Sequence, residues 1–318
     1  MFLKNFLFVL SFFAGLGCGV SQDFRYTFHQ FNAFAVNPAM AAMQKQFSVS
    51  YHSRKQRVEA GLSHRTLMLS ALYPFLEAEK HYGTIGLSLH QDRQSYFGKT
   101  HAFDIVAATN FDLHKEKNIK LALGLQGGSR TIEDELQGTE YFPAWGAGLM
   151  LYQDLHANPY QKHWFLGASG SNFLGNDRFL ENYYFAGETR WIISGGLLLW
   201  TNGKYSLVPN FRSILHKQIN FSNYGLSLRR NFSENSGTLF RYGSWGLSAW
   251  YAHQQAISIA IDIDTPALTM GFAYAFHSEK QLFSYKDANE FVITIKKSLH
   301  KKRNFDDKPV INETEKPL

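Results

Sequence analysis

The chain has 318 residues, of which 45% are hydrophobic, 16% aromatic and 18% charged. This content of apolar and aromatic residues excludes a disordered chain, because burying them offsets the entropy lost on ordering. A formal net charge of +6 is too small to indicate nucleic-acid binding without a basic cluster. Phe 28, Tyr 16 and Trp 6 beside Gly 25 and only Pro 8 are typical of strands rather than helices.

The first 21 residues are predicted to be a secretory signal peptide. Lys4 precedes an apolar run from Phe6 to Leu16, and small residues follow. Cleavage after Ser21 would remove Cys18, the only cysteine, so the mature chain would have no disulfide. The alternative is that Cys18 is a lipidated N-terminus, although Gly15 stands where such a site has Leu.

The segment 22–45 is aromatic and extended up to the dipeptide Asn37-Pro38. This dipeptide starts turns, because Asn can cap its own backbone and Pro fixes φ. Such an apolar segment is not expected to remain a free tail. Two interpretations stay open: a short plug folded into the mouth of the β structure, and a segment that binds a partner.

From residue 46 onward, apolar residues alternate with small or polar residues, which is the period of β-strands. In the run 257–263, for example, four Ile alternate with Ser, Ala and Asp. No segment of similar length keeps the 3.6-residue period of a helix. The alternation and the turn residues predict fourteen strands, near 46–54, 58–74, 81–94, 99–113, 117–130, 142–156, 161–172, 181–197, 203–216, 217–231, 240–253, 255–264, 265–276 and 289–299.

These strands predict an all-β protein, and specifically a transmembrane antiparallel outer-membrane β-barrel of about 14 strands. Several of them exceed the usual 5–6 residues of a soluble strand and suit the roughly 9–11 tilted residues that cross a bilayer. The second face carries Gly, Ser, Ala and isolated charges, as the interior of a barrel does. A soluble β-sandwich, which also alternates, is the alternative. We expect a signal peptide at 1–21, the segment 22–45, the barrel at 46–299 and a charged tail at 300–318.

The sequence contains no constellation that indicates catalysis. The Ser, His and metal-ligand motifs of hydrolases and the phosphate loop of nucleotide-binding proteins do not occur. We therefore expect no enzyme, no catalytic residue, no metal site and no cofactor. Asp262 and Asp264 would point together into the lumen, where they could bind a cation or, as the favoured interpretation, pair with Arg229 or Arg230.

The residues around Asn37 resemble the start of the PorP/SprF family of Bacteroidetes outer-membrane proteins. The matching residues are Phe31, Asn32, Asn37, Pro38, Ala39 and Ala41. Three residues depart from the family pattern: Met40 replaces a Tyr, Ala33 a Pro and Ala42 a Gly. The stretches 82–92, 120–128 and 143–149 resemble later strands of the family in the same order, so the similarity covers almost all of the mature chain.

This resemblance implies a non-enzymatic outer-membrane barrel of the type IX secretion and gliding-motility machinery. It would bind secretion core proteins and help to export or anchor a cognate secreted surface protein, with the lipid bilayer as its surroundings and no nucleic acid as partner. The six matching residues would be partner-binding residues. Aromatic side chains in loops are further candidates for contact, because they offer large area at modest entropy cost: Tyr141, Phe142, Tyr183 and Tyr184.

Three other functions compete with this expectation. A passive pore or small-solute transporter is the main alternative, because fourteen strands can enclose an open lumen. A soluble β-sandwich binding protein would be extracted without detergent. An outer-membrane lipase or protease is disfavoured, since the nucleophile motifs are missing.

Overall fold

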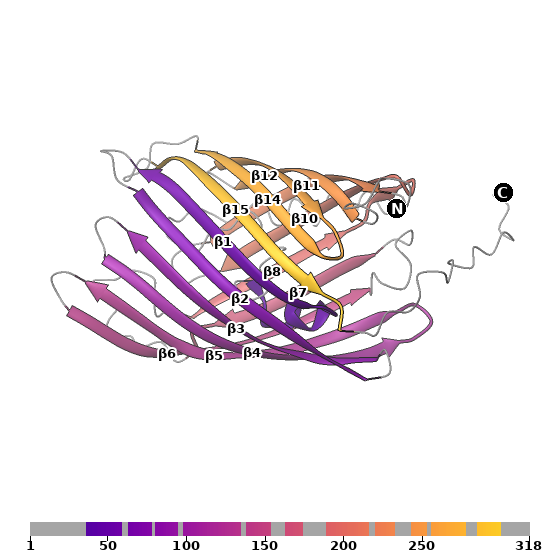
Figure 1. Ribbon diagram of the computed structural model, residues 1–318, viewed down its shortest axis with the longest axis horizontal. Helices are drawn as coiled ribbons and strands as arrows, with labels where there is room; N and C mark the ends of the chain where they lie inside the picture. Colours follow the sequence, from indigo (N-terminus) through magenta and orange to yellow (C-terminus); the bar gives the residue numbers. More distant parts are fainter. Residues whose placement is uncertain are drawn as a thin grey trace, which may run out of the picture.

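The computed structural model describes residues 36–58, 63–77, 80–94, 98–134, 138–153, 163–173, 189–215, 220–232, 243–252, 256–277 and 285–299. These residues form one antiparallel sheet that closes on itself (Figure 1). Strand β1 (Phe47–Val58) pairs with the last strand, β15 (Tyr285–Lys297), and this pairing completes the ring. The predicted fold is confirmed: the chain is a closed, fourteen-stranded antiparallel β-barrel.

The other strands follow around the wall in chain order. They are β2 (Ser63–Glu77), β3 (Lys80–Gln94), β4 (Gly98–His114), β5 (Ile119–Asp134), β6 (Gly138–Gln153), β7 (Trp164–Ser171), β8 (Arg190–Leu197), β9 (Trp200–Thr201), β10 (Tyr205–Leu215), β11 (Asn220–Phe232), β12 (Gly243–Ala252), β13 (Ala256–Asp264) and β14 (Leu268–His277). The two-residue β9 continues the line of β8, and both pair with β10. Because β8 and β9 share one place in the wall, the barrel has fourteen places, and each overlaps one predicted strand.

The two faces of the wall differ in the way that the alternation predicts. Outward side chains are large, apolar and exposed, as Leu125 (67%) and Ile295 (62%) illustrate. Inward side chains are small or polar and mostly buried, for example Ser88 and Ser248. This arrangement suits a wall whose outer face meets lipid, because closure pairs the backbone N–H and C=O groups that lipid cannot satisfy. No helix among the described residues is long and apolar enough to cross a membrane.

The barrel has two ends, which we call proximal and distal. The proximal end carries the turns 115–118, 202–204 and 265–267, together with the start of β1 and the end of β15. The distal end carries the opposite ends of the strands, such as the ends of β1, β3 and β5 at Val58, Gln94 and Asp134. A 3₁₀ helix, η2 (Pro38–Met43), lies inside the ring of strands, near the proximal end, and contacts β3, β4, β5 and β6 (Figure 1).

Candidate functional site

The segment from Val36 to Gln44 is held inside the barrel, and its local fold follows from the Asn37-Pro38 dipeptide. Asn37 is the N-cap of η2: its backbone is extended, with φ of −158°, and its Oδ1 accepts a hydrogen bond from the N–H of Ala39 at 2.9 Å. Pro38 occupies the first helical position, where its missing N–H costs nothing. The motif that sequence analysis singled out is therefore a helix start.

The same Asn37 side chain ties the segment to the wall. Its Nδ2 donates to the backbone oxygens of Leu149 on β6, at 3.0 Å, and Ala168 on β7, at 3.3 Å. One residue earlier, the carbonyl oxygen of Val36 accepts a hydrogen bond of 2.6 Å from Ser169 Oγ, also on β7. Asn37 is 1% exposed, so these bonds form away from water and satisfy groups that would otherwise be buried without partners.

Three glycines of the wall make room for this close approach. A Cβ on Gly124 of β5 would overlap the backbone of Pro38 and Ala39. A Cβ on Gly148 of β6 would overlap the Oδ1 of Asn37. On β7, a Cβ on Gly167 would lie 2.9 Å from Asn37 Nδ2. Only glycine at the first two positions lets main chain and cap approach the sheet so closely.

Beyond the cap, η2 packs through its alanines into an apolar cluster of the inner wall. Ala39, Ala41 and Ala42 are 0 to 1% exposed. Their buried neighbours come from β2, β4, β5 and β6: Leu72, Val106, Ala108, Ala122, Met150 and Tyr152. Small residues on both sides permit a tight fit, so the helix fills the proximal part of the lumen beside this wall.

The end of the segment has a second polar anchor. Asn110 Nδ2 donates to the carbonyl oxygen of Ala42 at 3.3 Å, and Thr84 Oγ1 donates to that of Gln44 at 3.3 Å. His81 lies between the two anchoring side chains, with Nδ1 3.1 Å from Asn110 Nδ2 and Nε2 3.0 Å from Thr84 Oγ1. We call the segment 36–44 with these contacts the plug.

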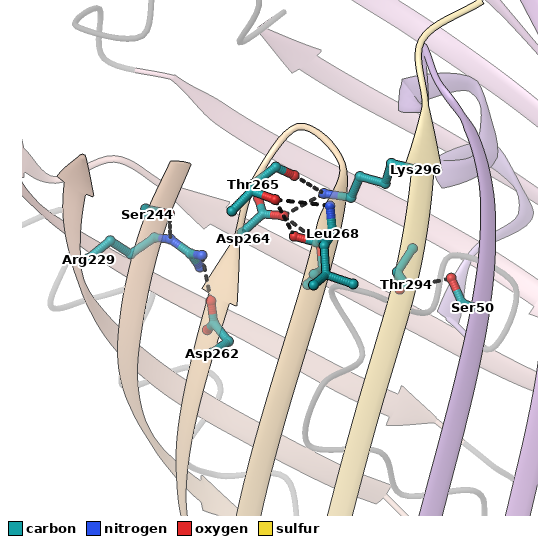
Figure 2. A network of polar contacts seen from close by, with 10 residues as sticks. Ser50, Arg229, Ser244, Asp262, Asp264, Thr265, Leu268, Thr294 and Lys296 are labelled. Carbon is teal, nitrogen blue, oxygen red and sulfur yellow. Dashed lines mark hydrogen bonds and ion pairs between the residues drawn. The ribbon is translucent and has the colours of Figure 1, made fainter. Parts of the chain in front are cut away.

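The opposite wall, from β11 to β15, is lined by polar side chains and ion pairs. Arg229 of β11 pairs with Asp262 of β13 at 2.6 Å, and its Nε donates to Ser244 Oγ at 3.2 Å. Lys296 of β15 pairs with Asp264, and Thr269 Oγ1 donates to the same carboxylate oxygen of Asp264 at 2.5 Å. Figure 2 shows both pairs, each of which reaches across one intervening strand of this wall.

These pairs settle one expectation from sequence. Asp262 pairs with Arg229, as the favoured interpretation predicted, whereas the partner of Asp264 is Lys296. Arg230 instead lies on the outer face, with its guanidinium 6.0 Å from the centre of the Tyr205 ring. Among the described residues, no group of three or more His, Cys, Asp or Glu could hold a metal ion.

The structure brings together four of the six predicted motif residues and places them apart from two of the aromatic candidates, Tyr141 and Phe142. Asn37, Pro38, Ala39 and Ala41 are buried in the plug. Phe31 and Asn32 lie outside the described residues, as do Tyr183 and Tyr184.

Tyr141 and Phe142 were expected in a loop, and this placement is wrong because both lie within β6. The strand begins earlier than predicted, at Gly138, whose φ of 91° suits glycine. Tyr141 is 76% exposed near the distal end, so it remains available for contact.

Sequence reasoning missed the receiving side of the plug. Gly148 lies in the stretch 143–149 that resembles a family strand, but nothing in that stretch, and nothing at Gly167, Ser169 or Asn110, indicated a docking surface. One feature of the sequence could have indicated the docking surface. Gly124, Gly148 and Gly167 stand at inward positions of the successive strands β5, β6 and β7, and Gly124 pairs directly with Gly148.

Comparisons with known proteins agree with this architecture. A family model described as type IX secretion system membrane protein PorP/SprF matches residues 19–296. No curated protein sequence matches the chain.

Two solved structures resemble the barrel. A FadL homologue from Pseudomonas aeruginosa is 9% identical, with a TM-score of 0.52, over 84% of this chain and 94% of that one. The toluene transporter TbuX of Ralstonia pickettii is 9% identical, with a TM-score of 0.48, over 83% and 93%. At this identity the first likeness shows the fold alone.

Proposed function

Because the chain belongs to the PorP/SprF family of type IX secretion system membrane proteins, we propose that it is a plugged barrel that binds a cognate secreted surface protein and helps to export or anchor it. The family and the barrel fold place the chain in the outer membrane, in association with the secretion machinery. Neither the family nor the fold is known for catalysis.

The observation that carries the proposal is the plug. A barrel that works by conduction needs an open lumen, whereas here the segment 36–44 is held against strands β2 to β7 by hydrogen bonds and apolar packing. A segment held inside the barrel in this way supports a function in which the barrel offers surfaces to other proteins. The passive pore, our main alternative, is not favoured by the family assignment.

The motif residues contribute to partner binding, in this proposal, by fixing the plug. Asn37, Pro38, Ala39 and Ala41 contact the inner wall, so they set the position of the segment and leave other surfaces for contact. Tyr141 is the best described candidate for direct contact, because it combines a large ring with 76% exposure near the distal end.

The test uses the tagged full-length chain, expressed in cells, solubilised gently and recovered with its partners. We expect secretion proteins and one large surface protein to copurify. Tyr141→Ser should reduce recovery of the surface protein several-fold and leave the secretion proteins unchanged. Tyr251→Ser is the matched control, because Tyr251 is an exposed aromatic residue on the opposite side of the barrel and should change neither.

Two outcomes would contradict the proposal. The first is purification without any secretion or surface protein above the level of an untagged strain. The second is a steady ohmic current through the unmodified chain in a planar bilayer, which would return the passive pore to first place.

A further inference from the structure

Four basic residues form one row on the outer face of the barrel near its distal end. They are Lys55, Arg65, Arg93 and Lys99, one each on β1, β2, β3 and β4, and all four are exposed. The strand register sets each directly opposite the next: Lys55 faces Arg65, Arg65 faces Arg93, and Arg93 faces Lys99. These strands lie side by side in Figure 1. We call this set the distal basic row.

The like charges of such a row repel one another unless nearby anions compensate them. Side chains directly opposite each other have Cβ atoms about 5 Å apart, and like charges there are destabilising. Within the described chain, Lys99 has an acidic neighbour, Glu133, at 3.9 Å. The described residues provide no ion pair or hydrogen bond to the side chains of Lys55, Arg65 and Arg93. The row therefore offers unused donors and positive charge to a ligand from outside the chain.

The distance of the distal basic row from the apolar rows indicates that it lies at the depth of the lipid headgroups. Two side-chain positions closer to the middle of the barrel, the same four strands carry an apolar row: Tyr51, Leu69, Leu89 and Phe103. Four residues of strand span about 13 Å. With a strand tilt of about 40°, this distance is about 10 Å along the membrane normal. The headgroup region begins at the edge of the hydrocarbon and is about 5–7 Å deep, so the basic side chains reach it.

The described residues of the other side of the barrel form no such row. At the distal end of β11 to β14, the corresponding outward row is aromatic and aliphatic: Tyr224, Tyr251, Ile257 and Phe276. Among the residues whose side chains the structure describes, the outward positive charge at this level of the wall is therefore concentrated in the sector from β1 to β4. A general need for solubility at the rim would not produce this asymmetry.

We propose that the distal basic row binds the phosphate groups of lipid headgroups in the adjoining leaflet. Arg65 and Arg93 offer planar guanidinium groups that suit two phosphate oxygens at once, and the two lysines add point charges at either end. Four neighbouring strands span about 14 Å, which is room for more than one phosphate. Lipid is favoured over an acidic protein because the row shares the outward face with the lipid-facing apolar rows.

The experiment measures binding of fluorescent phosphatidic acid to the full-length protein in micelles of a neutral detergent. Phosphatidylcholine is the zwitterionic comparison. We expect phosphatidic acid to bind at least tenfold more tightly, and added salt to reduce this preference. Each single Gln substitution in the row should weaken binding about fivefold, and the quadruple variant K55Q/R65Q/R93Q/K99Q at least a hundredfold.

The matched control is K204Q/R230Q, which removes exposed cations at the proximal end and should change affinity less than twofold. A shift of heated against unheated protein in gel electrophoresis verifies that each variant is folded. Equal binding of the two lipids, or equal loss in the control, would overturn the proposal. It would also fail if a poly-glutamate peptide or inorganic phosphate bound through the row while lipid binding did not respond to the quadruple variant.

Discussion

Two parts of the inner wall of this barrel fill the interior in different ways. The wall from β3 to β7 removes side chains: Gly124, Gly148 and several alanines leave room for the main chain of the plug. The wall from β11 to β15 keeps side chains and pairs their charges, as Arg229 and Asp262 do. The same barrel thus uses close backbone approach on one side and electrostatic compensation on the other.

This difference indicates how each wall should respond to mutation. A docking wall is sensitive to added volume, because overlap with a neighbouring backbone cannot be relieved by turning a side chain. A charge-lined wall is sensitive to the loss of one partner, because the other then stays buried and uncompensated. The following predictions test this contrast, beginning with the largest effect.

Arg229→Met should cost the most. It leaves the Asp262 carboxylate, whose side chain is fully buried, without its cation, and loss of one partner of a buried pair typically costs about 3–5 kcal/mol. Urea unfolding of the protein in detergent measures the change. Arg230→Met is the neighbouring control on the outer face and should change little. The double variant Arg229→Met/Asp262→Leu should recover most of the loss; no recovery would argue against the charge explanation.

Gly124→Ala should destabilise by about 1–3 kcal/mol and release the plug, because the new Cβ overlaps the backbone of Ala39. Gly127→Ala is the matched control on the same strand: its Cβ would lie 2.8 Å from the ring of Trp145, which is exposed and can turn away. Planar-bilayer recordings should show current for Gly124→Ala alone. If the two variants lost the same stability and gave the same current, the glycine that contacts the plug would not differ from other glycines of the wall.

Asn37→Ala should cost about 0.5–2 kcal/mol, the usual range for a lost N-cap. Asn37→Asp separates capping from docking. It keeps the oxygen that caps Ala39 but sets a buried carboxylate against the carbonyl oxygens of Leu149 and Ala168. We expect Asp to be at least as harmful as Ala, measured by hydrogen exchange of the amides of 39–43. A harmless Asp would show that the wall contacts contribute little.

Lys296→Gln should have the smallest effect, below about 1 kcal/mol. Asp264 is partly exposed, so water screens its charge, and Thr269 Oγ1 still donates to it. Urea unfolding again provides the measurement, with Lys297→Gln as an exposed control. If Lys296→Gln lowered the free energy of unfolding as much as Arg229→Met, the difference in burial would not explain the relative contributions of the two ion pairs.

The barrel itself could be predicted because the alternation of apolar and small or polar residues within each strand indicates that one face meets lipid and the other the barrel interior. The run from Ile257 to Ile263 becomes four exposed outward side chains on β13, as the alternation requires. The pairing of Asp262 with Arg229 was also accessible, because both residues stand at inward positions of nearby strands.

The docking of the plug could not be derived in the same way. The Asn37 amide meets carbonyl oxygens 112 and 131 residues away, and their proximity depends on the register of strands that the sequence does not specify alone. The aromatic pair Tyr141-Phe142 was misplaced for a local reason: β6 begins at Gly138, four residues before the strand predicted near 142–156.

The seam between β1 and β15 has a consequence for biosynthesis. Lys297 stands opposite Phe47, so the first strand to leave the ribosome must wait for the last one. Until then two strand edges remain open, and a lipid interior does not tolerate unpaired edges. A chain that stopped before Tyr285 would leave β14 and β1 without their shared neighbour. Closure of the wall therefore requires a chain that extends to the end of β15.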